Sequence, residues 1–95
     1  MHPAVYILTN RRYGTLYIGV TSNLPARVWL HRNDVVAGFT KRYGTHRLVY
    51  FEMCASMIAA IAREKQLKEW RRAWKLQLID GFNHEWRDLW DEISG

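Results

Sequence analysis

Two short segments near the start of the chain combine β-branched and aromatic residues, and a polar link separates them. Residues 4–9 (AVYILT) and 15–21 (TLYIGVT) have the composition of strands, and the NRRYG link has Asn and Gly where a tight connection needs them. The pattern therefore predicts a β-hairpin. With residues 10–13 as the loop, counting back along both strands places Tyr6 directly opposite Tyr17, and cross-strand partners share a face of the sheet.

Residues 22–32 (SNLPARVWLHR) change from the strand pattern to a helical one. Ser22 or Asn23 suits the N-cap position, and a proline is tolerated in the first turn that follows. Arg27 and His31 are four residues apart, so helical spacing points both side chains the same way. We expect a guanidinium and an imidazole on one face of this helix.

A third strand and a long helix are expected in the middle of the chain. Residues 46–52 (HRLVYFE) have strand composition, and residues 55–70 (ASMIAAIAREKQLKEW) predict a helix capped by Ser56. At about 100° per residue, Glu64 falls in the same sector as four apolar residues, namely Met57, Ala60, Ile61 and Leu67. A carboxylate among apolar neighbours needs a cation, a strong hydrogen-bond donor or a metal ion.

The segment 33–46 (NDVVAGFTKRYGTH) has the composition of a loop. It combines two glycines and two aromatic residues with Lys41 and Arg42, and a mobile basic loop of this kind suits contacts with a nucleic-acid backbone. A further helix is expected over residues 71–79, where apolar residues recur at core spacing, with Gly81 as its stop signal.

The predicted elements follow the order β-β-α-β-α-α. This order is typical of an α+β domain, in which helices pack against a small three-stranded antiparallel sheet. A chain of 95 residues can bury one core but not two, so we expect a single domain over residues 1–95. The lone Cys54 has no partner for an intrachain disulfide or a zinc site and is interpreted as a small buried hydrophobic residue.

Charge is distributed unevenly along the chain. Residues 1–79 hold thirteen Lys or Arg against four Asp or Glu, a balance of +9, whereas residues 80–95 hold one against five, a balance of −4. A basic body favours a polyanionic partner, because neutralising phosphates releases counterions; a basic surface that serves only solubility is the alternative. The sequence has no apolar run of about 18 residues and no signal-peptide pattern, so we expect a cytoplasmic protein without a membrane partner.

The candidate site residues have complementary chemistry. Two tyrosine hydroxyls, one guanidinium, one imidazole and one carboxylate would come from the hairpin and from the two helices that pack on it. Phosphodiester hydrolysis needs such groups: water must lose a proton, the phosphate charge must be stabilised, and the departing oxygen needs a metal ion or an acid. Each residue alone also has a structural interpretation, since aromatic pairs across a hairpin stabilise sheets without any catalytic role.

The same residues resemble the motifs of the GIY-YIG nuclease superfamily, and in particular its small single-domain bacterial members. The first motif corresponds to residues 4–6 (AVY), with Ala in place of Gly, and the second to residues 17–19 (YIG). The helical Arg of the family corresponds to Arg27, the His one turn later to His31, and the metal-binding Glu to Glu64. The resemblance covers nearly the whole chain.

This resemblance implies a single divalent cation, Mg²⁺ or Mn²⁺, bound through Glu64 together with waters and the phosphate. Tyr17 would activate the attacking water and Tyr6 would orient the water or the phosphate. A free tyrosine has a pKa of about 10, so the metal, Arg27 and His31 would supply the positive charge that proton removal requires. Arg27 would hold the non-bridging oxygens, and His31 would either donate to the phosphate or relay a proton. The products would be a 3′ hydroxyl and a 5′ phosphate.

The expected function is therefore that of a metal-dependent DNA endonuclease in repair or recombination, directed by DNA structure or backbone with little sequence specificity. RNA remains an alternative substrate, a protein partner for targeting is left open, and the protein is expected as a monomer or weak homodimer. A non-catalytic nucleic-acid-binding module that uses Lys41 and Arg42 is the competing interpretation. Asn83 is the best candidate for the Asn that often follows in the family, with a helix cap or turn residue as the alternative. The acidic, Trp-rich segment 85–90 either docks onto another protein or a second copy, or completes the core.

Overall fold

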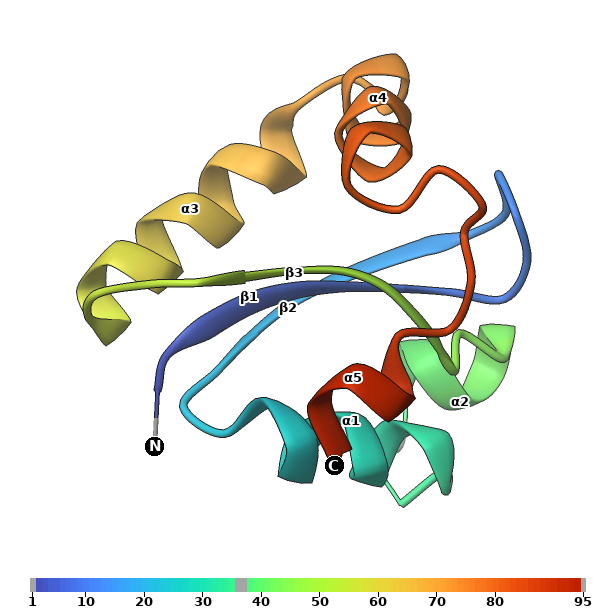
Figure 1. The fold of residues 1–95 in the computed structure, drawn as a ribbon, viewed down its shortest axis with the longest axis horizontal. Coiled ribbons are helices and arrows are strands. Elements are labelled where there is room, and N and C mark those ends of the chain that lie inside the picture. Colours follow the sequence, from blue (N-terminus) through green and yellow to red (C-terminus); the bar gives the residue numbers. More distant parts are fainter. Residues whose placement is uncertain (1, 36–37, 95) are drawn as a thin grey trace.

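The computed structural model describes residues 2–35 and 38–94. A three-stranded antiparallel sheet lies at its centre, between two layers of helices (Figure 1). The strands are β1 (Ala4–Thr9), β2 (Leu16–Thr21) and β3 (Arg47–Met53), and they lie in the order β2-β1-β3. The predicted α+β class with its three-stranded antiparallel sheet is confirmed.

The central strand β1 is buried along its whole length, and its side chains alternate between the two helical layers. Val5 and Ile7 belong to the core beneath α3 (Met57–Glu69) and α4 (Arg72–Phe82). The other face of β1 carries Ala4, Tyr6 and Leu8. These residues pack towards α1 (Leu24–Arg32) and the segment that leads into α5 (Trp90–Ser94). One domain therefore carries a hydrophobic cluster on each face of its sheet, and Tyr6 belongs to the cluster on the α1 side.

The predicted helix starts are confirmed by their caps. The side chain of Asn23 accepts a hydrogen bond from the backbone nitrogen of Ala26 at 3.3 Å, and the Ser56 hydroxyl accepts one from Ala59 at 3.1 Å. Gly81, in contrast, does not stop α4. The helix continues to Phe82 and ends at the cap Asn83, because a single glycine costs a helix only about 1 kcal/mol.

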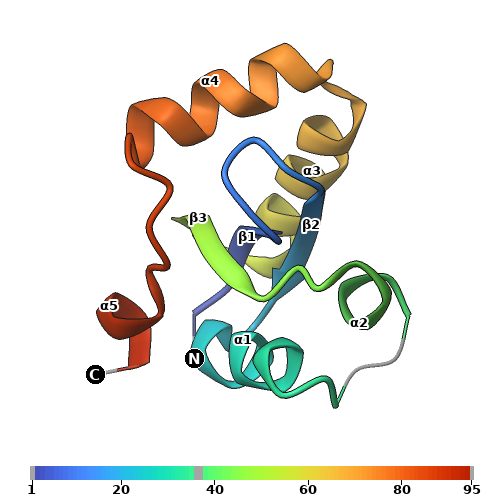
Figure 2. The ribbon, with the colours of Figure 1, turned by 90° about the vertical axis from the view of Figure 1, so that its right-hand side faces the viewer.

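The segment predicted as a basic loop contains a short helix, α2 (Phe39–Tyr43). Gly44 follows it in the left-handed conformation, with a φ of 65°, and caps its C-terminus. Figure 2 shows α2 beside the sheet, in the same layer as α1. This placement brings α2 against the Tyr6 face of the sheet.

The hairpin is longer in its loop than the sequence predicts. Thr9 pairs with Leu16, so Gly19 rather than Tyr17 lies opposite Tyr6. The Asn10 side chain explains the difference, because its Oδ1 accepts a hydrogen bond from the Thr15 backbone at 3.0 Å and closes a wider loop. The register differs by two residues, which leaves every side chain on its expected face. The rings of Tyr6 and Tyr17 are still neighbours, with centroids 6.2 Å apart.

The acidic C-terminal segment forms part of the core of this chain. Trp86 is fully buried, and its indole nitrogen donates to Asp80 Oδ1 at 2.6 Å. Leu89 packs in the core beside α1 and donates its backbone nitrogen to the carbonyl of Leu48 at 2.8 Å. Of the two interpretations of this segment, the structure supports the completion of the core. Cys54 is half-buried rather than buried, and no helix among residues 2–35 and 38–94 could cross a membrane.

Candidate active site

Three polar side chains form a buried line from the central strand to α2. The Tyr6 hydroxyl and Nε2 of His31 are 2.9 Å apart, and Nδ1 of His31 lies 2.9 Å from the Thr40 hydroxyl oxygen. Tyr6 and His31 are each 1% exposed and Thr40 is 2% exposed. Both nitrogens of the imidazole are thus occupied by hydroxyl groups of the protein itself.

The burial of this line determines its protonation. Burial, reinforced by the positive charges of Arg27 and His46, lowers the pKa of His31 from 6.5 to about 4. The ring is therefore neutral at pH 7, with one donor and one acceptor nitrogen. Either Tyr6 donates to Nε2 while Nδ1–H donates to Thr40, or Thr40 donates to Nδ1 while Nε2–H donates to Tyr6. The expectation that His31 supplies positive charge to the site is wrong, since the charged ring is unfavourable in this position.

Tyr6 also keeps its proton. Burial raises the pKa of Tyr6 and the neighbouring Tyr17 adds to the increase, while the Arg27 guanidinium opposes both. A hydroxyl that stays protonated can donate a hydrogen bond but is a poor base. This suits an orienting role for Tyr6 rather than proton abstraction.

Gly19, the last residue of the second motif, makes room for the Tyr6 ring. A methyl group built on Gly19 would lie 2.4 Å from Cζ of Tyr6 and 2.5 Å from its hydroxyl oxygen, far inside van der Waals contact. The register explains this, because the two residues are directly opposite on β1 and β2. The glycine is required at this position by the side chain that crosses it.

Tyr17 and Arg27 lie at the accessible edge of the buried line. Both are half-buried. The Tyr17 ring centroid is 5.2 Å from that of His31, and the charge of Arg27 affects the pKa values of both Tyr6 and His31. The four residues that the sequence places on the hairpin and the first helix therefore come together on one side of the sheet.

Glu64 comes from the opposite layer. It lies on α3, which packs against β1 and β2, the edge strand that carries Tyr17. Its side chain is 16% exposed, and its Oε2 lies 3.3 Å from the ammonium nitrogen of the more exposed Lys68. Within residues 2–35 and 38–94, no hydrogen bond or ion pair joins Glu64 to Tyr6, Tyr17, Arg27 or His31.

The buried side chain of Asn83 connects α4 with β3 and with the C-terminal segment through hydrogen bonds. It is the C-cap of α4, and its amide nitrogen donates to the carbonyls of Val49 at 3.2 Å and Arg87 at 2.8 Å. Its amide oxygen accepts from the Arg87 backbone at 3.2 Å. These contacts support the helix-cap interpretation of Asn83.

Comparison with protein families bears directly on this cluster. The model of the GIY-YIG catalytic domain matches residues 2–77, which is most of the chain. The chain belongs to the GIY-YIG family. The resemblance inferred from the motifs is thereby confirmed, and the matched range includes both motif triplets, Arg27, His31 and Glu64 but ends before Asn83.

Several relatives of this GIY-YIG protein are of similar length. A UPF0213 protein of Clostridium perfringens is 41% identical over 75 residues, which cover 79% of this chain and 80% of the relative. One from Syntrophus aciditrophicus is 41% identical over 66 residues, covering 68% of this chain and 76% of the relative. The solution NMR structure of a UPF0213 protein from Bacillus halodurans has 31% identity and a TM-score of 0.52, and the match covers 84% of both chains.

GIY-YIG nucleases generally depend on a divalent metal, and the donor set here restricts which kind would fit. The described part of the chain contains no group of three or more His, Cys, Asp and Glu side chains that could hold an ion. A site closed by protein ligands alone, such as structural zinc requires, is therefore not present there. Glu64 fits Mg²⁺ or Mn²⁺, which bind through one or two carboxylates and take their other oxygens from water and phosphate.

The structure adds residues to the site that the sequence motifs do not contain. Thr40 holds the second nitrogen of His31, and no local sequence signal marks it. Phe39 packs its ring 5.7 Å from that of Tyr17, next to the exposed Lys41 and Arg42. The GIY-YIG site is thus covered on one side by α2.

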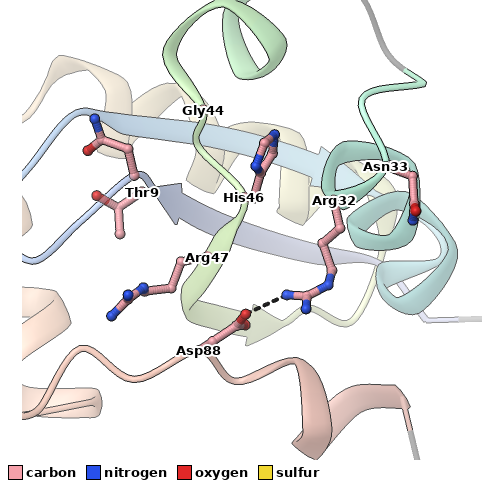
Figure 3. Close-up of a pocket in the computed structure, with 8 residues that line it drawn as sticks. Thr9, Arg32, Asn33, Gly44, His46, Arg47 and Asp88 are labelled. Carbon is pink, nitrogen blue, oxygen red and sulfur yellow. Dashed lines mark hydrogen bonds and ion pairs between the residues drawn. The ribbon is translucent and has the colours of Figure 1, made fainter.

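A polar pocket of about 490 Å³ lies away from this cluster, beside α1 and at the start of β3 (Figure 3). Its basic side chains are already engaged within the chain. Arg32 forms an ion pair with Asp88, Arg47 donates to the carbonyl of Trp86 at 3.1 Å, and His46 lies 2.7 Å from Asp34. These contacts connect α1, β3 and the C-terminal segment, so the residues that line the pocket have a structural role.

Proposed function

We propose that this GIY-YIG protein is a metal-dependent endonuclease that hydrolyses DNA phosphodiester bonds. The observation that carries the proposal is the convergence of two phenols, a guanidinium and a neutral imidazole on one side of the sheet. Packing alone does not explain this cluster. Apolar side chains would fill the same space, and they would leave no buried polar groups that need hydrogen-bond partners. The family membership supports nuclease chemistry of this kind.

Within this proposal the Tyr17 hydroxyl accepts the proton of the attacking water and passes its own phenol proton to solvent. Tyr17 is only half-buried, at the edge of the cluster, which leaves it open to exchange with water. Tyr6 orients the water or the phosphate through its hydroxyl, which stays protonated. His31 has no free nitrogen to offer a phosphate, so its part is to hold the Tyr6 hydroxyl in place.

Arg27 binds the non-bridging phosphate oxygens. Its guanidinium is the cation of the cluster, because burial keeps His31 neutral. The planar fork of arginine matches two phosphate oxygens at once, whereas a lysine ammonium is a point charge. Charge that grows on the phosphate in the transition state is stabilised here.

Glu64 would hold the divalent cation, which supplies positive charge for the departing oxygen when it is bound. Lys68 is the present partner of the carboxylate, and because the lysine is 54% exposed, an i,i+4 helix pair of this kind contributes only about 0.3–0.5 kcal/mol. A cation would therefore displace Lys68 at little cost. Glu64 lies on α3, whereas Arg27 and Tyr17 belong to the opposite face of the sheet. The proposal therefore requires that a phosphate bound by Arg27 and Tyr17 reaches Glu64 across the edge strand β2.

We further propose that the substrate is selected by structure rather than by base sequence, as in repair or recombination. Exposed cations such as Lys41 and Arg42 supply affinity for the backbone, which carries no sequence information directly. Branched DNA presents the deformed or unpaired regions that such a protein distinguishes from regular duplex.

The test incubates supercoiled plasmid and a branched duplex with the protein and Mg²⁺ or Mn²⁺, with EDTA as the metal-free arm. Glu64→Gln removes the metal-binding charge while it keeps the side-chain volume. Glu69→Gln makes the same change at an exposed position of the same helix and is the matched control. We expect nicking by the parent and by Glu69→Gln, and none by Glu64→Gln or in EDTA.

Two results would contradict the proposal. Equal nicking by the parent and Glu64→Gln would show that Glu64 is not part of the active site. Salt-sensitive binding of DNA without cleavage of any substrate in either metal would support the non-catalytic binding module instead.

A further inference from the structure

Aromatic rings continue outward from the candidate active site onto α2. The ring of Phe39 lies 5.7 Å from that of Tyr17, and the ring of Tyr43 lies 4.7 Å from that of Phe39. Phe39 is 42% exposed and Tyr43 is 44% exposed. The series therefore begins in the buried cluster and ends at the protein surface.

Two large rings on a five-residue helix are more exposed than packing requires. Together with Lys41, Arg42 and Gly38 they line a shallow hollow of about 560 Å³. The Arg42 guanidinium lies over the Tyr43 ring, 5.4 Å from its centroid, which leaves a cation beside the aromatic surface. Aromatic rings flanked by cations are the combination that binds single-stranded nucleic acid, because rings stack on bases and cations attract phosphates.

The geometry points to one ligand class, and this inference rests on the proposed function. We propose that Phe39 and Tyr43 stack on an unpaired base of the DNA strand to be cleaved, next to the phosphate held at Tyr17 and Arg27, while Lys41 and Arg42 contact the flanking phosphates. A base inside a regular duplex has both faces covered by its neighbours and offers no surface to an exposed ring. The preference for unpaired or branched DNA is thus built into α2.

The probe is 2-aminopurine, a fluorescent base whose emission falls when it stacks on an aromatic ring. It is placed in a short single strand, in a single-stranded flap beside a junction, and inside the matching blunt duplex, all in EDTA so that the DNA stays intact. We expect the full-length protein to quench the probe in the strand and in the flap but not inside the duplex.

Phe39→Leu keeps an apolar side chain and removes the ring. We expect it to weaken binding of the single strand about tenfold, in line with the usual contribution of a base stacked on an aromatic side chain. Binding of the duplex should stay unchanged. Phe39→Trp should restore the quenching. Trp29→Leu, at a ring on α1 that is 50% exposed, is the control and should bind like the parent.

The outcomes separate this inference from the proposed function. If Phe39→Leu binds the single strand as tightly as the parent, or loses strand and duplex binding equally, the stacking site is refuted whether or not the nicking assay shows cleavage. If quenching depends on Phe39 but no DNA is cleaved, the stacking site stands and the endonuclease proposal fails. Circular dichroism of each variant confirms that the chain is folded.

Discussion

Substitution of Gly19 by alanine tests the arrangement of the site most simply, because it adds one methyl group. The added carbon would lie 2.4 Å from Cζ and 2.5 Å from the hydroxyl oxygen of Tyr6. Carbon atoms in contact normally stand about 3.5–4 Å apart, so the ring has to move by roughly 1 Å. Tyr6 is 1% exposed, and a shift of its ring disturbs the hydrogen bond to His31.

The energetic effect combines three contributions. Overfilling a packed core costs about 1–3 kcal/mol, and loss of the hydrogen bond to His31 costs about 1 kcal/mol more. The lower backbone entropy of alanine in the unfolded chain returns about 0.4–1 kcal/mol. We expect Gly19→Ala to lower the free energy of unfolding by about 2 kcal/mol and to abolish most of the cleavage activity, since Tyr6 no longer occupies its position.

Urea unfolding followed by tryptophan fluorescence measures this change. Gly81→Ala is the matched control, because a methyl group there meets no atom within 4 Å and lies in the helix α4. It should raise the free energy of unfolding by about 0.5–1 kcal/mol. In a Tyr6→Ala background the space is empty, so Gly19→Ala should no longer destabilise. The reasoning is refuted if Gly19→Ala is as stable as the parent, or if its effect is the same with and without the Tyr6 ring.

Three further predictions concern the buried polar groups. Thr40→Val should lower the free energy of unfolding by about 1 kcal/mol and alter the ring-nitrogen NMR shifts of His31, because Nδ1 loses its partner; unaltered shifts would contradict the hydrogen bond. The folded state disfavours protonated His31, so its contribution to stability is intact above pH 6.5 and is lost as the pH falls towards 4, by about 3 kcal/mol. His31→Gln should lack this part of the pH dependence in urea titrations, and an unchanged dependence would argue against a buried neutral ring. Asn83→Ala should destabilise by about 2 kcal/mol in the same assay, since three hydrogen bonds are lost; a fully stable variant would show that the cap is unimportant.

Local signals in the sequence predicted the elements well wherever one or two residues decide them. The strand over residues 4–9 is confirmed, and so are the caps Asn23 and Ser56, because β-branched composition and side-chain capping act within a few residues. The helical wheel also placed Glu64 correctly on the covered side of α3, although Ile61 in the same sector is 39% exposed. The periodicity of apolar residues predicts which face of a helix packs against the protein. It does not predict how much of that face the neighbouring elements cover.

Features that depend on tertiary contacts were not predictable in the same way. The hairpin register depends on a hydrogen bond from Thr15 to the side chain of Asn10, and composition gives no sign of it. The short helix α2 is held in place by the contacts of Phe39 with Tyr17 and of Thr40 with His31. It is too short to show a hydrophobic period of its own in the sequence. The same contacts bury His31 and keep it neutral, whereas the family resemblance implied that His31 supplies positive charge to the site.

The central claim is that the cluster performs acid-base chemistry on a DNA phosphodiester, and the single-turnover cleavage rate of Tyr17→Phe tests it most directly. The substitution removes one oxygen atom, and Tyr13→Phe removes the equivalent oxygen from an exposed tyrosine outside the site as the control. The account predicts that Tyr17→Phe binds DNA normally but cleaves it at least about 100-fold more slowly, as loss of a general base requires, while Tyr13→Phe cleaves at the parent rate. Cleavage by Tyr17→Phe at the parent rate would contradict it.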